Sequence, residues 1–349
     1  MRIALDAMGG DQAPLRIVEG GLQALRESNN RFELVFVGHK EEVQKEISAH
    51  HGAGLNYSIV NAREVIEMQE TPNTALREKR DSSIVVGLNL QIEGKAHAFV
   101  SAGNTGAVMS ATTLILGRIK GVSRPTIGTP LPTVDNGVCL LLDSGANSDC
   151  RPQHLVEFGL MGSIYAKEIQ SKENPTVGLL NIGEESSKGN ELAQASYRLL
   201  EKSDLNFIGN IEGRDILMGK ADIVLADGFV GNVVLKFAES FLPALRTRFK
   251  RYASENIFKT IWAGLMSRTI KKVLSGFSYE VQGGAPLLGV KGVSIIGHGG
   301  STTIAVKNMV LRAEEVVNHN ISKLIENSIK KSSRKELLLN GNFEQKSKG

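Results

Sequence analysis

Cysteine is scarce in this chain, with only Cys139 and Cys150 among 349 residues. There is no CxxC pair and no cluster of histidines, which argues against a disulfide scaffold or a structural zinc site and favours a reducing cytoplasm. Cys139 lies in the apolar run 138–142, where a small buried side chain is the ordinary interpretation. We therefore expect neither cysteine to be a nucleophile.

A secretion signal and long apolar runs are also lacking. Residues 2–6 already have the pattern of a strand, with no cleavage site near them. No apolar stretch approaches the length of about 20 residues that a membrane-spanning helix needs. We expect a cytoplasmic protein that does not cross a membrane.

Proline is low at nine residues, whereas glycine is high at 37. Glycine without proline favours tight turns that approach a ligand over flexible linkers. The length suits one two-lobed catalytic unit over residues 1–330, and the polar stretch 331–349 is expected to be a flexible tail.

The net charge of +4 is unevenly distributed. Residues 244–275 contain eight Lys or Arg against one acid, Glu255, while the rest of the chain is acidic apart from its basic C-terminal end, so nucleic-acid binding is not predicted. Apolar residues recur at helical spacing among these cations, which predicts protruding amphipathic helices. A membrane surface, an acidic carrier protein and simple core or subunit packing remain alternatives for this segment. The residues assigned to the contact are Ile261, Trp262, Leu265, Arg268, Lys271 and Lys272.

Short apolar runs alternate with amphipathic stretches along most of the chain. This alternation predicts an α/β fold with a mostly parallel sheet covered by helices on both faces. The expected strands are 2–7, 32–38, 57–62, 98–102, 138–143, 176–181, 206–211, 223–227 and 293–297. The expected helices include 14–28, 40–50, 82–94, 104–117, 152–170, 189–202 and 301–328.

Ligands of such folds bind outside the carboxyl ends of the strands. Here that position is rich in Gly, Asp, Asn and Ser, and we expect six turns on one sheet edge to form the site. The turns are 6–11, 101–106, 143–147, 181–190, 227–232 and 297–301. They contain the candidate residues Gly9, Gly10, Asp11, Asp143, Asn147 and Asp227.

The turn 101–106 leads directly into a predicted helix. Unpaired N–H groups at a helix N-terminus favour an anion, and glycine lets the backbone approach it. Ordinary N-capping needs no ligand and is the alternative. We favour a phosphate site made of Ser101, Gly103, Asn104, Thr105 and Gly106.

Known nucleotide motifs are missing: there is no GxxxxGK[ST] loop, no GxGxxG in the first turn and no GxSxG. Asp6, Asp11, Asp143 and Asp227 could bind Mg²⁺ if they converge, but capping and turn bracing are the commoner roles. We expect no metal and no cofactor. Lys188 is interpreted as a phosphate cation rather than a surface lysine, and His298, flanked by glycines, as a site residue.

Eight segments together closely resemble the phosphate acyltransferase (PlsX) family of bacterial phospholipid synthesis. The resemblance runs over about residues 1–328. The segments, in order, are DAMGGDQAP, SAGNTGA, RPTIGTPLPT, LLDSGAN, LLNIGEESSKGN, ADIVLADGFVGNVVLK, GGAPLLGVKG and HGGS.

The resemblance implies a Rossmann-like fold related to phosphotransacetylases and isocitrate/isopropylmalate dehydrogenases, and a homodimer. It implies transfer of an acyl group from acyl-carrier protein to inorganic phosphate. The acyl phosphate would then serve a membrane glycerol-3-phosphate acyltransferase, so peripheral association with the inner face of the membrane is expected.

Phosphate is a good enough nucleophile to attack a thioester directly, so we expect a ternary complex without an acyl-enzyme. The phosphate turn would hold phosphate with Lys188 offsetting charge, while Asn232 or His298 donates to the thioester oxygen or leaving sulfur. One rival is an NAD- and metal-dependent β-decarboxylating dehydrogenase on the same fold, which needs an arginine cluster that the sequence does not reveal. A non-catalytic binding protein is the other.

Overall fold

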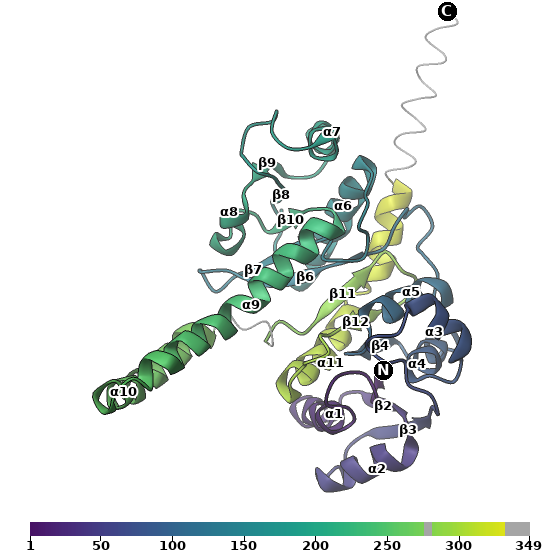
Figure 1. Ribbon diagram of the computed structural model, residues 1–349. Helices are drawn as coiled ribbons and strands as arrows, with labels where there is room; N and C mark the ends of the chain where they lie inside the picture. Colours follow the sequence, from purple (N-terminus) through teal and green to yellow (C-terminus); the bar gives the residue numbers. More distant parts are fainter. Residues whose placement is uncertain (276–280, 332–349) are drawn as a thin grey trace, which may run out of the picture.

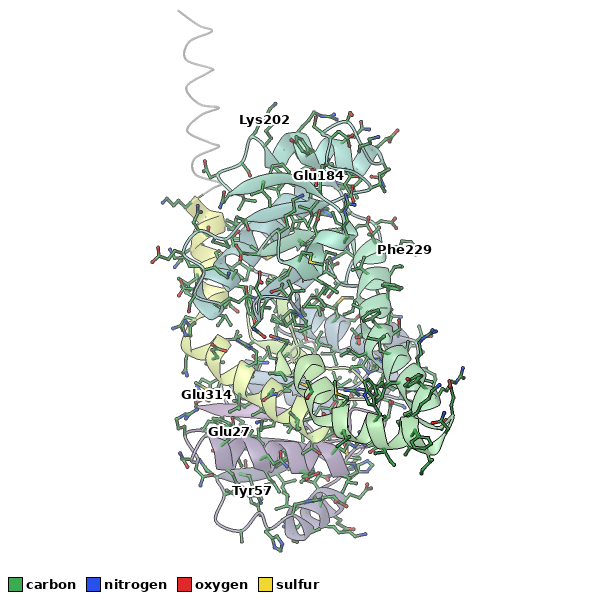
Figure 2. All side chains as sticks on the ribbon, turned by 90° about the vertical axis from the view of Figure 1, so that its left-hand side faces the viewer. Glu27, Tyr57, Glu184, Lys202, Phe229 and Glu314 are labelled. Atoms are coloured by element: carbon green, nitrogen blue, oxygen red, sulfur yellow. The ribbon has the colours of Figure 1, made fainter. Side chains whose placement is uncertain are left out.

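The computed structural model describes residues 1–275 and 281–331, with the backbone alone of residues 268 and 270–275. The chain forms two lobes, each built on its own sheet (Figure 1). In Figure 2, Glu27 and Tyr57 mark the first lobe, and Glu184 and Lys202 mark the second.

The first sheet has seven strands in the order β3-β2-β1-β4-β12-β11-β5. Strands β1 to β4 and β12 are parallel, and β11 is antiparallel to both of its neighbours. Their bounds are β1 Arg2–Asp6, β2 Glu33–Gly38, β3 Tyr57–Asn61, β4 Ala98–Ser101, β5 Thr126–Ile127, β11 Ala285–Leu288 and β12 Ser294–Ile296.

The second sheet has five strands in the order β6-β7-β10-β8-β9, and only β6 is antiparallel. The chain enters it at Gly128, the single residue between β5 and β6. The bounds are β6 Thr129–Pro132, β7 Val138–Leu142, β8 Val177–Leu180, β9 Phe207–Ile211 and β10 Ile223–Leu225.

Helices cover both faces of the first sheet because successive strand residues point to opposite sides. Ile3 and Leu5 of β1 pack in the cluster that contains α1 and α11, whereas Ala4 packs in the cluster that contains α4 and α5. The helices of the two lobes are α1 Leu15–Glu27, α2 Lys40–Ala49, α3 Pro72–Glu78, α4 Ser83–Ile92, α5 Thr105–Ile115, α6 Pro152–Ile169, α7 Glu191–Leu200, α8 Gly213–Met218 and α11 Thr303–Asn318.

The predicted parallel α/β architecture is confirmed, and each of the nine expected strands is present. The sequence prediction missed β5, β6 and β11, which are short antiparallel strands. Strands β6 and β11 contain prolines, which have no backbone N–H to donate to a neighbouring strand, so proline normally argues against a strand. The prolines are Pro130, Pro132 and Pro286. The predicted helix 301–328 is broken at Asn320, whose φ is 52°.

A long hairpin leaves the second lobe and consists of α9, Gly228–Ala253, and α10, Ile257–Ser275 (Figure 1). Helix α9 carries an exposed apolar row at i, i+4 spacing: Phe229, Val233, Phe237, Phe241 and Leu245. By length and composition alone α9 could span a membrane, contrary to the sequence expectation, but the buried Gly228 and Gly231 of its first turn pack on the second lobe. Apart from Lys331, the predicted tail lies outside the described residues.

Candidate active site

Three of the predicted turns meet at the first sheet because they follow the adjacent parallel strands β1, β4 and β12. A Cβ added to Gly9 would lie 2.5 Å from Asp6 Oδ2 and 2.7 Å from the Gly103 nitrogen. The Asp11 N–H donates to the Gly299 carbonyl at 2.8 Å. Only glycine permits this close contact between turns.

The Ser101 hydroxyl forms its hydrogen bonds with residues of these adjoining turns. It accepts from the Gly103 N–H at 3.0 Å and donates to Asp6 Oδ2 at 2.6 Å. Burial raises the pKa of Asp6 above its ordinary value, although hydrogen bonds from Ser101 and Ser83 act in the opposite direction. Ser101 therefore braces β1 against β4, while its predicted contact with phosphate stays a prediction.

Asn104 is likewise used by the fold. Its Oδ1 accepts from the Ala107 N–H at 3.0 Å and caps α5, as the N-capping alternative expected. Its Nδ2 donates to the carbonyls of Glu67, Met68 and Glu70 at 3.0 to 3.2 Å. The side chain thus fixes segment 67–70 above the α5 N-terminus.

The remaining residues of the phosphate turn are less enclosed. Thr105 is exposed and Gly106 is half-buried at the first turn of α5. A Cβ added to Gly106 would lie 2.8 Å from Pro72 Cγ, so glycine at this position allows α3 to pack closely against α5. Backbone N–H groups and the Thr105 hydroxyl are the donors that this turn can offer an anion.

The other three turns follow β7, β10 and β8 of the second sheet, so the six turns occupy two sheets rather than one edge. Asp143 is fully buried and accepts hydrogen bonds from the backbones of Ile127, Gly145, Ala146 and Asn147 and from the Asn147 amide. Burial raises the pKa of Asp143, and these donors oppose that shift. Asp143 braces its turn, as expected.

The N-terminus of α9 packs directly on this turn. Asp227 caps the helix by accepting from the Val230 N–H at 2.8 Å. A Cβ on Gly231 would overlap the Asp143 carbonyl oxygen, and one on Gly145 would lie 3.4 Å from Asn232 Cγ. Close packing thereby fixes the exposed Asn232 beside the turn 143–147.

His298 lies on the 297–301 turn and faces helix α9. The Gly300 N–H donates to His298 Nδ1 at 3.0 Å, which places the ring proton of the neutral histidine on Nε2. That Nε2 lies 4.0 Å from Glu239 Oε2 of α9, and Glu239 also pairs with Lys236 at 2.8 Å. His298 is thus an oriented N–H donor between the 297–301 turn and α9.

Lys188 is exposed on the β8–α7 turn. Its carbonyl accepts from the Asn181 amide at 3.0 Å, and its N–H donates to the Glu185 carbonyl at 3.1 Å. These bonds fix the turn and leave the ammonium at the surface of the second lobe. Its role as a phosphate cation stays a prediction.

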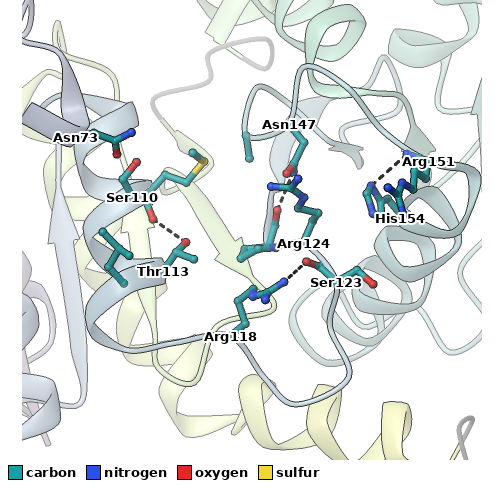
Figure 3. Close-up of a pocket in the computed structure, with 13 residues that line it drawn as sticks. Asn73, Ser110, Thr113, Arg118, Ser123, Arg124, Asn147, Arg151 and His154 are labelled. Atoms are coloured by element: carbon teal, nitrogen blue, oxygen red, sulfur yellow. Dashed lines mark hydrogen bonds between the residues drawn. The ribbon is translucent and has the colours of Figure 1, made fainter.

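The sequence reasoning missed a cationic cleft between the lobes (Figure 3). The cleft has a volume of about 650 Å³, and three arginines line it: Arg118, Arg124 and Arg151. They come from separate segments after α5 and before α6, and no residue spacing signalled their convergence. The only signal was the RPTIGTPLPT segment, which begins at Arg124.

Comparison with known proteins places the chain in a family. The family model described as "Fatty acid synthesis protein" matches residues 1–324. The chain is 49% identical to a phosphate acyltransferase of Heliobacterium modesticaldum over 332 residues, covering 94% of this chain and 98% of the relative. It is 45% identical to a phosphate acyltransferase of Chlorobaculum parvum over 333 residues, covering 93% and 98%.

The chain belongs to the phosphate acyltransferase family. It is therefore an acyltransferase, and its family serves lipid synthesis. The fold resembles that of a phosphotransacetylase from Streptococcus pyogenes, with a TM-score of 0.59 at 17% identity over 91% of this chain and 94% of the other. A branched-chain phosphotransacylase from Enterococcus faecalis gives 0.57 at 14% identity, over 91% and 99%.

The family assignment decides against the dehydrogenase and the non-catalytic binding protein. The expectation that the chain has no arginine cluster was nevertheless wrong, because three arginines line the cleft. Family membership, rather than the residue pattern of one site, carries this distinction.

Proposed function

We propose that the protein transfers a fatty acyl group from acyl-carrier protein to inorganic phosphate, supplying acyl phosphate for phosphatidic acid synthesis. A phosphate oxygen attacks the thioester carbon, the C–S bond breaks, and the sulfur leaves as a thiolate that takes a proton from solvent. No covalent acyl-enzyme is needed, since phosphate is itself the nucleophile.

Separate residues would bind phosphate and stabilise the charge that develops on the thioester. The α5 N-terminus and the Thr105 hydroxyl receive phosphate, and Lys188 offsets its charge. The Nε2–H of His298 and the amide of Asn232 donate to the oxyanion or the departing sulfur. The observation that carries this proposal is the orientation of His298 by Gly300, because an N–H fixed in direction before reaction can stabilise developing charge.

A single-turnover assay tests the reaction. Free thiol released from acyl-carrier protein should depend on added phosphate, with stoichiometric formation of acyl phosphate. His298→Ala and Asn232→Ala should each lower the rate by roughly 10²–10³ if they donate to developing charge. Arg198→Gln, at an exposed position on α7, is the matched control. Phosphate-independent thiol release by the wild type would contradict direct transfer.

We expect the protein to bind peripherally to the cytoplasmic face of the membrane, near the membrane glycerol-3-phosphate acyltransferase, and the exposed residues of the hairpin support this expectation. Ile261, Trp262 and Leu265 of α10 are exposed, which rules out burial in the core of this chain. The side chains of Arg268, Lys271 and Lys272 lie outside the described residues. Exposed apolar residues beside Arg246, Arg248 and Lys250 suit an anionic lipid surface.

We assign the apolar row of α9 to a second copy of the chain in a homodimer. Lys236 and Glu239 of α9 form a salt bridge with each other. The apolar row from Phe229 to Leu245 therefore lacks the excess of positive charge found in residues 244–275. A neutral apolar row beside the site suits a protein partner better than a lipid surface. Phe237→Glu should shift the molar mass toward that of the monomer in light scattering.

A further inference from the structure

Helix α9 carries three polar side chains on one face, and one of them faces the 297–301 turn. Asn232, Lys236 and Glu239 are at positions i, i+4 and i+7 of the helix, so they share one side of it. Glu239 Oε2 lies 4.0 Å from His298 Nε2. The proposed reaction uses Asn232 and His298, and the two charged residues lie on the same helix face.

Glu239 is the most enclosed of the three ionisable side chains that meet here. Its side chain is 21% exposed, compared with 54% for Lys236 and 48% for His298. It lies one turn after Leu235, which packs on the second lobe, and one turn before the buried Leu242. Glu239 therefore borders the helix face that is turned toward the protein, where a carboxylate has fewer available directions than on the outer face.

The His298 ring is fixed from the other edge by the backbone of its own turn. The Gly300 N–H donates to Nδ1 at 3.0 Å, so the proton of the neutral ring is on Nε2, the nitrogen nearest Glu239. The 4.0 Å separation exceeds the range of about 2.7–3.2 Å for an N–H···O hydrogen bond. The carboxylate attracts this N–H and leaves it free to donate to an oxygen or sulfur of the substrate.

Lys236 balances the charge of Glu239. Its ammonium group lies 2.8 Å from Oε2, the same oxygen that faces His298. An unpaired carboxylate beside the Nε2–H would repel an oxyanion that formed there, because like charges repel at such distances. The pairing reduces this repulsion, so Glu239 can orient the ring without opposing the charge that the ring stabilises.

A second carboxylate, that of Asp11, borders the same turn on the other side of the ring. A Cβ added to Gly300 would lie 3.3 Å from His298 Nδ1 and 3.7 Å from Asp11 Oδ2. The Asp11 N–H also donates to the Gly299 carbonyl. Asp11 thus holds the backbone of the turn at the Nδ1 edge, whereas Glu239 faces the edge that carries the proton.

We propose that Glu239 is a positioning residue that directs the His298 Nε2–H toward the reacting thioester, with Lys236 balancing its charge. The inference rests on the proposed function, in which that N–H stabilises the charge that develops as phosphate attacks. Glu239 touches no substrate and acts through His298. Its removal therefore affects kcat rather than KM.

A double-mutant cycle tests whether Glu239 acts through His298. Glu239→Gln should lower kcat for thiol release by about five- to tenfold, with little change in KM for phosphate or acyl-carrier protein. In the His298→Ala background the same substitution should change the rate by less than about twofold, because the group that it positions is gone. Glu239→Asp keeps the charge and should lose less activity than Glu239→Gln.

Glu168→Gln is the matched control. Glu168 faces His319 at 3.7 Å, which makes a second pair of glutamate and histidine. It lies in the last turn of α6, at the opposite end of that helix from the turn 143–147. Its substitution should leave both kcat and KM unchanged.

The ring nitrogens of His298 give a measurement that needs no turnover. In protein labelled with nitrogen-15 histidine, long-range proton–nitrogen spectra at pH 8 should show His298 in the Nε2–H form. The loss of its signals in His298→Ala assigns them. Glu239→Gln should shift these resonances and populate the Nδ1–H form in part, whereas Glu168→Gln should leave them unchanged.

Two results would overturn the proposal. Identical His298 resonances in the wild type and Glu239→Gln would show that the carboxylate does not act on the ring. A loss of rate in Glu239→Gln that is equally large in the His298→Ala background would assign Glu239 a contribution of its own. Failure of the proposed function has a different signature, because His298→Ala would then keep the wild-type rate whatever the ring spectra show.

Discussion

Ser101 of β4 donates a 2.6 Å hydrogen bond to Asp6 of β1, and both side chains are buried. The hydroxyl also accepts from the Gly103 N–H, so it joins two neighbouring turns and leaves little capacity for a ligand. The bond fixes the relative positions of the carboxyl ends of β1 and β4. Its contribution is therefore to the shape of the site and to stability.

Ser101→Ala should lower the free energy of unfolding by about 1–3 kcal/mol, because it removes one of the donors that satisfy the buried Asp6 carboxyl group. Urea denaturation measures this loss. Thr105→Ala, at an exposed position four residues later, should have little effect on stability. A Ser101→Ala protein of normal stability but much raised KM for phosphate would instead establish Ser101 as a ligand.

Gly106→Ala should disturb the contact between α5 and α3, since the new Cβ would meet the rigid ring of Pro72 at 2.8 Å. We expect a stability loss of about 1–3 kcal/mol and slower thiol release. Gly213→Ala is the matched control, because nothing lies within 4 Å of a Cβ there. Equal stability of the two variants would show that α3 yields without cost.

Neither cysteine is suited to covalent catalysis. Burial raises the pKa of the Cys139 thiol to about 12, and burial together with the Asp143 charge raises that of Cys150 to about 12. Both thiols therefore remain protonated from pH 7 to 9. The double variant Cys139→Ala/Cys150→Ala should retain activity, and the protein incubated with acyl donor alone should show no mass increase equal to an acyl group.

The single tryptophan reports on the hairpin. Trp262 is 51% exposed, and Leu265 beside it is 76% exposed. Anionic vesicles should shift Trp262 emission to the blue, and high salt should weaken the shift by screening. Leu265→Glu should abolish vesicle binding and leave transfer from soluble acyl-carrier protein largely intact. Emission that is already blue and indifferent to vesicles would place Trp262 in a protein interface instead.

Much of the architecture could be predicted from the sequence. Apolar runs such as 33–38 and 98–101 alternate with amphipathic helices, and a buried parallel strand needs little more than such a run to be recognised. The glycine-rich turns after β1, β4 and β12 were also predictable, since the carboxyl ends of parallel strands hold the ligand-facing turns. The family followed from the resemblance of eight segments along the chain, of which the turns after β1, β4 and β12 contain three.

The division of the six turns between two sheets depended on tertiary structure. The chain passes from the first sheet to the second at Gly128, between β5 and β6. This crossing could not be predicted, because β6 is a proline-containing antiparallel strand that the sequence does not indicate. The same holds for the roles of individual polar residues. Ser101 and Asn104 have the composition of phosphate ligands, yet their hydrogen bonds are directed to Asp6 and to the carbonyls of 67–70.

The sequence by itself determined the fold class and which residues form the turns, because both depend on local patterns of apolar residues and glycine. Eight sequence motifs indicated the family. Only the tertiary structure brought Arg118, Arg124 and Arg151 into one cleft, and only it oriented His298 between Gly300 and Glu239. Such convergence depends on the packing of two lobes, and residues distant in sequence meet there without any periodicity that could have indicated it.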